Sequence, residues 1–293
     1  MPGPFGNTSR FLVDIPEAFI DCVMAENGAA WLASLPAQLG HFCRIWKLTP
    51  DGPPRHGYLG LAFPVLRAGV PLVLKLTRVD QETFHEAAAL RAWDGRGAVH
   101  LLDASAGVLL LERLDASRTL AGLEIEQAIS VAARLLRRLT VPTDGPFLDL
   151  SNYAIQLHRL AEARWERFRP FPLEWLALPE VRSDLLVNQD LHYENVLASL
   201  REPWLVIDPK PLRGDPEFAV APLLWNRYQE GTTLARFEQI VSEASLDRDL
   251  AMNWTVFRVL EYWLWALDRG LTEDPPRCRA LAAELLQGQQ FTD

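Results

Sequence analysis

The sequence has few cysteines and no excess of positive charge. Its three cysteines, Cys22, Cys43 and Cys278, lie far apart and never in a CxxC spacing, which excludes a disulfide framework and a cysteine-based zinc site. The formal net charge is −9, whereas a nucleic-acid-binding protein usually presents a basic face. We therefore expect no nucleic-acid partner, and the acidic balance favours solubility or the attraction of cationic ligands.

Signals for membranes and for export are also missing. No run of about 18 apolar residues is free of charge, so no transmembrane helix is predicted. The N-terminal sequence MPGPFGNTSRFLVDIPEAF has no basic start followed by an apolar segment, so no signal peptide is predicted. We expect a cytoplasmic protein without membrane association, and no feature indicates an obligate protein partner.

The first part of the chain predicts a small sheet with helices. A length of 293 residues suits one large domain or two modest ones, and a composition of 49% hydrophobic and 23% charged residues is ordinary for a folded soluble protein. Helical periodicity predicts one or two helices at residues 15–37 and a further helix at residues 80–95, with Asp80 as its N-cap and Gly95 at its end. Short apolar runs separated by turn residues predict strands at residues 42–50, 57–68, 71–78, 98–105 and 107–114.

After Leu114 the pattern becomes mainly helical. Helices are predicted at residues 121–139, 150–169, 172–183, 231–244 and 248–269. The only strands clearly indicated in this half are residues 196–199 and 204–208. The sequence thus predicts an α+β protein with a small-sheet domain at residues 1–114 and a helical domain at residues 115–293.

Five polar residues stand out against this layout. Lys75 lies within the strand sequence LVLKL, where a charge is costly unless it has a partner. Glu86 lies on the following helix and is expected to face inward. Asp190 and Asn195 share one loop, and Asp208 ends the next apolar run.

Phosphoryl transfer requires this set of groups, and their order along the chain agrees with the protein-kinase pattern. A lysine holds the phosphates, a helix carboxylate holds the lysine, and a second carboxylate receives the proton of the attacking hydroxyl. An Asn and an Asp bind magnesium through oxygen. The protein-kinase pattern is H-R-D-L-x-x-x-N, and NQDLHYEN keeps its Asp-to-Asn step and its Leu. Each residue alone has an ordinary structural explanation as a rim, surface or turn residue, so the joint order carries the prediction.

Three stretches resemble the aminoglycoside phosphotransferase superfamily, namely DLHYENVLAS (190–199), EPWLVIDPKPLRGDPEF (202–218) and APLLWNR (221–227). Flanking sequences such as WLASLPA and FPVLRAGVPLVLKL are similar to its streptomycin 6-kinase and hydroxyurea phosphotransferase branch. The resemblance runs from about residue 15 to residue 270. It implies a protein-kinase-like two-lobed fold, with a small antiparallel-sheet N-terminal lobe with one main helix and a mostly helical C-terminal lobe.

The resemblance also implies ATP and Mg²⁺ as cofactors and assigns roles to individual residues. Lys75 contacts the phosphates and pairs with Glu86, Asp190 is the catalytic carboxylate, and Asn195 and Asp208 bind magnesium. The backbone from Glu112 to Leu114 meets the adenine. The loop with Gly57 and Gly60 covers the phosphates, although it does not match G-x-G-x-x-G.

Two positions depart from the family pattern. Asn188 stands where the family usually has His, and Ala219 stands where GDPxFDLAP has Asp. In kinase-like folds both residues support the loop and do not react. Our hypothesis is that the two losses are coupled, so that a differently connected loop accepts Asn188.

A cationic small molecule is the expected acceptor. Carboxylates and aromatic faces suit guanidinium groups, and Glu261, Trp265 and Asp268 share one helical face. Asn226 is a further candidate for substrate contact. The alternative is that Trp265 belongs to the core, that Asp268 ends a solvated helix, and that Asn226 and its neighbour Arg227 brace the chain.

The sequence therefore predicts an ATP- and Mg²⁺-dependent kinase acting on a hydroxyl of streptomycin or a related aminoglycoside, and thus an antibiotic-resistance enzyme. Two alternatives stay open. One is a catalytically weak or inactive kinase-like module that binds a nucleotide or small molecule without turnover. The other is a kinase for a metabolite such as a sugar or an amino alcohol.

Overall fold

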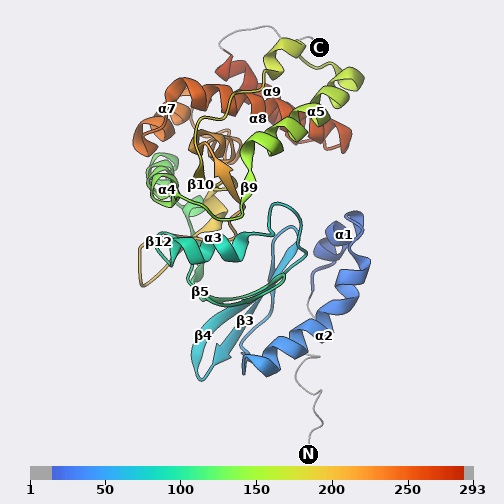
Figure 1. The fold of residues 1–293 in the computed structure, drawn as a ribbon, viewed down its shortest axis with the longest axis vertical. Helices are drawn as coiled ribbons and strands as arrows, with labels where there is room; N and C mark the ends of the chain where they lie inside the picture. The colour runs from blue at the N-terminus through green and yellow to red at the C-terminus, as the bar shows by residue number, and fades with distance from the viewer. Residues whose placement is uncertain (1–14, 287–293) are drawn as a thin grey trace, which may run out of the picture. The chain divides into compact units, whose positions relative to one another are not determined.

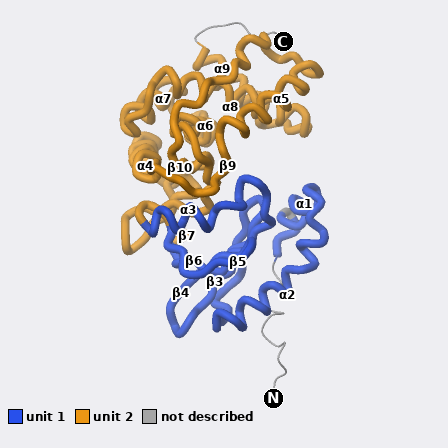
Figure 2. The backbone as a smooth tube through the Cα atoms, in the orientation of Figure 1, with its two compact units in different colours: residues 1–95, 99–114 blue, residues 96–98, 115–293 orange. Residues whose placement is uncertain are grey.

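The structure is a computed structural model that describes residues 15–286. Most of the N-terminal sequence considered above for a signal peptide lies outside these residues. The chain divides into two compact units (Figure 2). Unit 1 comprises residues 1–95 and 99–114, and unit 2 comprises residues 96–98 and 115–293. None of the helices in residues 15–286 has the length and apolar character needed to cross a membrane.

Unit 1 is an antiparallel sheet with helices (Figure 1). Its helices are α1 (Glu17–Ala25), α2 (Ala29–Ile45) and α3 (Glu86–Trp93). Its strands are β1 (Thr49–Pro50), β2 (Arg55–His56), β3 (Gly60–Arg67), β4 (Val70–Thr77), β5 (Leu101–Ser105) and β6 (Val108–Glu112). They follow the order β1-β3-β4-β6-β5, with β2 also pairing with β3. The β3–β4 turn uses Ala68 and Gly69 at φ values of 50° and 81°, as tight hairpins require.

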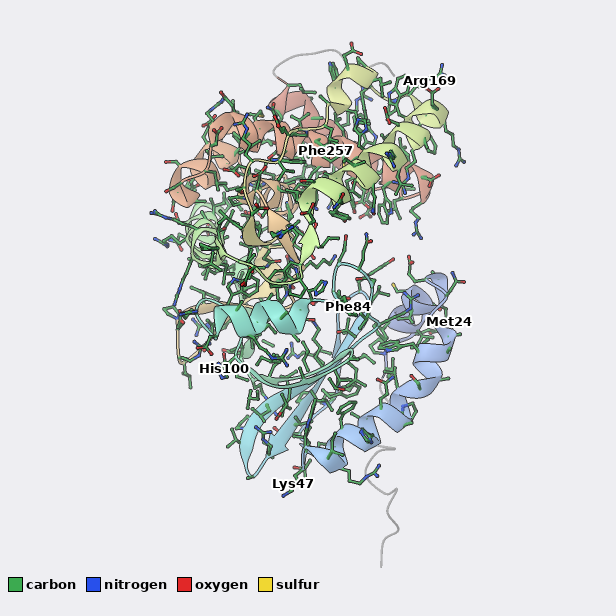
Figure 3. All side chains as sticks on the ribbon, viewed as in Figure 1. Met24, Lys47, Phe84, His100, Arg169 and Phe257 are labelled. Atoms are coloured by element: carbon green, nitrogen blue, oxygen red, sulfur yellow. The ribbon has the colours of Figure 1, made fainter. Side chains whose placement is uncertain are left out.

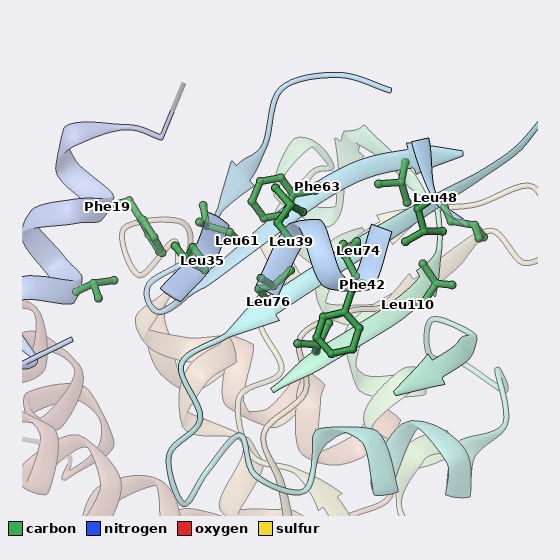
Figure 4. Close-up of a cluster of buried hydrophobic side chains, with 14 residues drawn as sticks. Phe19, Leu35, Leu39, Phe42, Leu48, Leu61, Phe63, Leu74, Leu76 and Leu110 are labelled. Carbon is green, nitrogen blue, oxygen red and sulfur yellow. The ribbon is translucent and has the colours of Figure 1, made fainter. Parts of the chain in front are cut away.

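One face of this sheet is apolar and packs on α2 (Figure 4). Leu72, Leu74 and Leu76 of β4 are at most 2% exposed and belong to this core. Leu39 and Phe42 of α2 belong to the same cluster. Side chains alternate between the faces of a strand, so Lys75 lies on the opposite face of β4.

Two predicted elements of unit 1 were wrong in extent. The strand expected at residues 42–50 is helical as far as Ile45, and only Thr49–Pro50 forms β1. The helix continues because Leu35, Leu39 and Phe42 are spaced to bury one helical face. The helix expected from residue 80 begins at Glu86, because Asp80 Oδ1 accepts hydrogen bonds from the N–H groups of Glu82 and Thr83 and caps a separate turn.

Unit 2 is mostly helical, with two small sheets. Its helices are α4 (Ile125–Leu139), α5 (Leu150–Phe168), α6 (Ala221–Trp225), α7 (Thr233–Ala244), α8 (Arg248–Asp268) and α9 (Asp274–Leu285). Its short 3₁₀ segments are η1 (Leu120–Gly122), η2 (Leu173–Leu176), η3 (Tyr193–Asn195) and η4 (Pro216–Ala219). Its strands are β7 (Asp115–Thr119), β8 (Val141–Pro142), β9 (Leu148–Asp149), β10 (Leu185–Asn188), β11 (Val196–Ala198), β12 (Trp204–Val206) and β13 (Pro211–Gly214).

The buried helix α8 is central to the core of unit 2. Its N-cap Asp247 accepts a hydrogen bond from the Leu250 N–H at 2.9 Å. Buried side chains cover most of its length, including Trp254, Phe257 and Leu260. Helices α5 and α9 both pack against it. This rigid helix carries Glu261, Trp265 and Asp268, the three predicted substrate residues.

The helix predicted at residues 172–183 was wrong, because only η2 forms there. Pro172 and Pro179 limit any longer helix. The sequence also missed α9, which begins at Asp274 with prolines in its first turn. The sequence also missed strands β10 and β13, which pair with each other across the intervening β11–β12 hairpin.

Candidate active site

Unit 1 contains a buried ion pair on the face of the sheet opposite α2. Lys75 Nζ lies 2.7 Å from both Oε1 and Oε2 of Glu86. Lys75 is 8% exposed and Glu86 is 3% exposed. Glu86 is the first residue of α3, so the start of that helix sets the position of its carboxylate. The expected pairing of these residues is present, while their role toward a nucleotide stays a prediction.

Gly60 lies beside Lys75 and Thr77. It pairs with Thr77 across β3 and β4, and a Cβ at Gly60 would lie 3.4 Å from Thr77 Oγ1 and 3.7 Å from Lys75 Cε. Thr77 Oγ1 is buried and has no hydrogen-bond partner among residues 15–286. The side chains of Lys75 and Thr77 and the glycine at position 60 therefore lie close together. An ammonium group, a hydroxyl group and a residue without a side chain suit the binding of a phosphate. The Gly57 N–H donates to the Gly60 carbonyl at 3.0 Å and closes the preceding turn.

The end of β6 is firmly attached to the sheet. The Glu112 N–H donates to the His100 carbonyl at 3.0 Å, and Glu112 Oε1 accepts from the His100 N–H at 2.7 Å. Arg113 donates to the carbonyls of Leu72 and Val65 at 3.1 and 2.6 Å. Leu114 follows directly in sequence. The predicted adenine contact of residues 112–114 therefore lies on a rigid segment and stays a prediction.

In unit 2, two antiparallel pairings bring distant parts of the chain together. Asn188, the last residue of β10, pairs with Pro211 of β13, and the Gln189 N–H donates to the Lys210 carbonyl at 3.0 Å. Strand β11 pairs with β12, and beyond it the Ile207 N–H donates to the Asn195 carbonyl at 2.8 Å. The register of these strands therefore places Asp190 beside Lys210 and brings Asn195 near the segment that carries Asp208.

Asp190 is accessible and has a cationic neighbour. Its Oδ2 lies 3.3 Å from Lys210 Nζ, and the two side chains are 27% and 34% exposed. Asn188 Oδ1 accepts from the backbone N–H groups of Asp190 and Lys210 at 3.2 and 3.0 Å. Asn188 is 2% exposed, so it is a buried support that joins the two segments.

Arg258 of α8 makes a second support for the same loop. Its Nη1 donates to the carbonyls of Gln189 and Phe218 at 2.9 and 3.1 Å. Its guanidinium carbon lies 4.4 Å from the centre of the Phe218 ring, where a cation–π contact is favourable. The neighbouring Ala219 is fully buried. In this chain, which has Ala219 in place of the family's Asp, hydrogen bonds of Asn188 and Arg258 hold the loop that carries Asp190.

The predicted magnesium ligands offer oxygen donors. Asp208 has a φ of 51°, a left-handed backbone conformation that Asp adopts more readily than most residues. Residues 15–286 contain no group of three or more His, Cys, Asp or Glu side chains able to hold a metal. Mg²⁺ is commonly held by one or two protein side chains together with substrate phosphates and water. The pair of Asn195 and Asp208 fits that smaller requirement.

The predicted acceptor carboxylates already bind arginine. Glu261 Oε1 and Asp268 Oδ2 each lie 3.5 Å from Arg164 of α5. Asp268 Oδ1 also lies 2.9 Å from Arg167 Nη1. Their negative charge is thus compensated within unit 2, and a cationic acceptor would compete with these arginines. Their substrate role stays a prediction.

Trp265 belongs to an aromatic stack. Its ring centroid lies 5.3 Å from that of Tyr262, which in turn stacks on Trp225 at 5.1 Å. The Arg269 guanidinium carbon lies 5.5 Å from the Trp265 ring centre. Asn226 Nδ2 donates to the Pro222 carbonyl at 2.9 Å, so its amide nitrogen braces the backbone. Contact of Trp265 or Asn226 with substrate stays a prediction.

Sequence reasoning missed Lys210 and Arg258 as parts of this site. Lys210 lies within the family-like stretch at residues 202–218. Its position near Asp190 depends on the pairing of β10 with β13. Arg258 stands within the apolar stretch of α8 between the buried residues Phe257 and Val259. A charged residue in such a stretch is a usable signal, because it requires a polar partner.

A family model described as aminoglycoside/hydroxyurea antibiotic resistance kinase matches residues 45–270. The chain belongs to this family. It is accordingly a small-molecule phosphotransferase, and the resemblance inferred from the sequence is confirmed.

Characterised relatives match almost the whole chain. Hydroxyurea phosphotransferase of Kitasatospora aureofaciens is 40% identical over 294 residues, covering 94% of this chain and 86% of that protein. Streptomycin 6-kinase of Streptomyces griseus is 40% identical over 290 residues, covering 89% and 92%.

A solved structure supports the fold. An aminoglycoside phosphotransferase in ternary complex with ADP and hygromycin B has a TM-score of 0.58 at 16% identity, covering 85% of this chain and 98% of that one. The kinase-like α+β fold predicted from the sequence is thereby confirmed.

Proposed function

We propose that this protein is an ATP- and Mg²⁺-dependent kinase that phosphorylates a hydroxyl of streptomycin or a closely related aminocyclitol. Nucleotide binding is assigned to residues 1–114, and acceptor binding and transfer to residues 115–293. The observation that carries the proposal is the accessible carboxylate of Asp190, which lies beside Lys210, in a loop where the Asp190 backbone N–H donates to Asn188 Oδ1. The similarity to streptomycin 6-kinase supports the choice of acceptor.

Asp190 orients the acceptor hydroxyl and receives its proton. Its carboxylate accepts a hydrogen bond from the hydroxyl, orients the oxygen toward the γ-phosphorus, and receives the proton as transfer proceeds. The hydroxyl oxygen forms a bond to this phosphorus while the bond to the β,γ-bridging oxygen breaks. Because Asn188 and Arg258 hold the loop before the substrates bind, little reorganisation is needed at the moment of transfer.

The nucleotide is assigned to residues of unit 1. Lys75, kept in place by both oxygens of Glu86, binds phosphate oxygens. Thr77 Oγ1 and Gly60 lie beside Lys75. Because Gly60 has no side chain, this place suits the close approach of a phosphate. Residues 112–114 bind the adenine through their backbone.

The metal is assigned to Asn195 and Asp208. Bound Mg²⁺ supplies positive charge that offsets the negative charge of the phosphates. The chain contributes side-chain oxygens from two segments whose spacing is set by the hydrogen bond from the Ile207 N–H to the Asn195 carbonyl. Substrate phosphates and water complete the coordination.

Hydroxyurea is a second candidate acceptor. The hydroxyurea phosphotransferase relative is as similar to this chain as the streptomycin 6-kinase relative. The compensation of Glu261 and Asp268 by Arg164 also makes a small uncharged acceptor suitable, because it has no need of a free carboxylate.

Magnesium-dependent ADP release against streptomycin, other aminoglycosides, hydroxyurea and simple sugars tests the proposal. We expect turnover with streptomycin, and a loss of about 10²–10⁴-fold in Asp190→Asn. Turnover with hydroxyurea alone selects the second candidate. Binding of ATP without turnover of any acceptor would instead indicate a binding module.

A further inference from the structure

Lysine is rare in this chain, and its positions are informative. Of the 29 lysine and arginine residues only three are lysines, namely Lys47, Lys75 and Lys210. Two of these three pair with carboxylates of the candidate site. Arginine offers a broad planar fork, whereas lysine offers a compact point charge. A chain that uses arginine almost everywhere else therefore keeps the compact cation at Lys75 and at Lys210.

The backbone of Lys210 is held tightly. Lys210 lies between Pro209 and Pro211, which fix their own φ angles, and the following proline restricts the backbone of Lys210 itself. Its N–H donates to Asn188 Oδ1, and its carbonyl accepts from the Gln189 N–H. Both main-chain polar groups of Lys210 are thus bonded to the segment that leads into Asp190.

The side chain of Lys210 is much more open than its backbone. Its ammonium lies 3.3 Å from Asp190 Oδ2, and the lysine side chain is 34% exposed. Ion pairs with this exposure contribute little to folding stability. A rigid backbone that presents an accessible cation beside the catalytic carboxylate is what recognition of an anionic group requires.

We propose that Lys210 is a catalytic residue that binds the transferring phosphoryl group. In the free protein its ammonium pairs with Asp190. During transfer it donates a hydrogen bond to a non-bridging phosphoryl oxygen, where negative charge is concentrated. This role rests on the proposed function. The bonds formed and broken are those given above, the proton goes to Asp190, and Lys210 remains protonated throughout.

Steady-state kinetics of Lys210→Met and Lys210→Arg test this role, with Lys47→Met as the matched control. Lys47 is an exposed lysine of unit 1 (Figure 3). We expect Lys210→Met to lower kcat about 100-fold, a loss typical of removing one group that stabilises transition-state charge. KM for ATP should change less than about threefold, and Lys210→Arg, which keeps the charge, should recover about tenfold of the loss. Lys47→Met should behave as the wild type.

The outcomes separate this inference from the proposed function. If the wild type turns over an acceptor, Asp190→Asn loses this activity and Lys210→Met keeps it, the role of Lys210 is wrong. The proposed function would still stand. A wild type without turnover of any acceptor overturns both. Thermal unfolding of each variant excludes misfolding, and an equal loss in Lys210→Arg and Lys210→Met with lowered thermal stability would show a merely structural role.

Discussion

The two units each contain a lysine–carboxylate pair, and the pairs differ in burial. In unit 1, Lys75 contacts both oxygens of Glu86 at 2.7 Å, and both residues are less than a tenth exposed. In unit 2, Lys210 lies 3.3 Å from one oxygen of Asp190, and about a third of each side chain is exposed. The same type of ion pair therefore occurs twice. The buried Lys75–Glu86 pair is the closed pair, and the exposed Lys210–Asp190 pair is the open pair.

Burial decides what each pair can do. Removing one partner of a buried pair leaves an uncompensated charge and typically costs about 3–5 kcal/mol, whereas an exposed pair contributes about 0–1 kcal/mol. The Lys75–Glu86 pair is therefore part of the folded framework. The Lys210–Asp190 pair is exposed enough to open at little cost in stability, so both of its members can contact substrates.

The largest expected effect comes from breaking the closed pair. Lys75→Met leaves Glu86 buried without its cation, so we expect the free energy of unfolding to fall by about 3–5 kcal/mol. Urea-induced unfolding measures this change. Lys210→Met in the same assay should change the free energy by less than about 1 kcal/mol.

A double variant separates stability from function at the closed pair. Lys75→Met combined with Glu86→Leu removes both charges and should recover most of the lost stability. ATP-dependent turnover should stay low, because the phosphate-binding ammonium is gone. Recovery of wild-type activity in the double variant would contradict the assigned role of Lys75.

The second prediction concerns how the open pair is held in place. Arg258→Met removes the donor to the Gln189 and Phe218 carbonyls, so the loop with Asp190 loses a support. We expect kcat to fall about 10- to 100-fold, because small misplacement of a reacting group is costly. Steady-state kinetics with the identified acceptor measures the loss.

Arg269→Met is the matched control for this prediction. Arg269 follows α8 and lies against the ring of Trp265, much as Arg258 lies against the ring of Phe218. The hydrogen bonds described above to the loop with Asp190 come from Arg258. Its kcat should stay within about threefold of the wild type. An equal loss of kcat in the two arginine variants would mean that Arg258 acts through general packing of α8.

The smallest effect is expected at a buried carboxylate that is not held by an ammonium. Glu217 is 7% exposed, and its Oε1 accepts from the Asp247 N–H at 3.0 Å. Burial raises the pKa of Glu217 above its ordinary value. The folded state therefore holds this proton more tightly than the unfolded chain, and stability falls as the pH rises through the folded-state pKa.

Glu217→Gln should remove that loss of stability. The amide keeps an oxygen acceptor for Asp247 and has no charge to bury, so the variant should gain up to about 1 kcal/mol at neutral pH and nothing at low pH. Thermal unfolding between pH 4 and pH 8 measures the difference. A variant that is less stable than the wild type at neutral pH would show that the charged form is favoured in the fold.

Several parts of the fold were predictable because they depend on neighbours in sequence. The short apolar run at residues 71–78 identified β4, and the continuous helical pattern of α8 identified its extent closely. The failures have different causes. Phe42 continued the buried face of α2 into a region predicted to be a strand. Strands β10 and β13 pair with each other across the β11–β12 hairpin, a long-range contact that no local pattern reveals.

The candidate site shows the same division between local pattern and tertiary contact. Five polar residues in the order of the protein-kinase pattern indicated phosphoryl transfer, because that chemistry requires a particular set of groups. Sequence spacing was not sufficient for the acceptor side. Glu261 and Asp268 share a helical face as expected, but Arg164 from α5 neutralises both.

The sequence by itself determined the family, the order of the reacting groups and the type of most long elements, since these follow from residue identity and short-range periodicity. Only the tertiary structure decided that Lys210 lies beside Asp190 and that Arg258 holds the loop that carries Asp190. Both contacts join residues at least 20 positions apart. They exist because strand register and helix packing, which act over long range, bring those segments together.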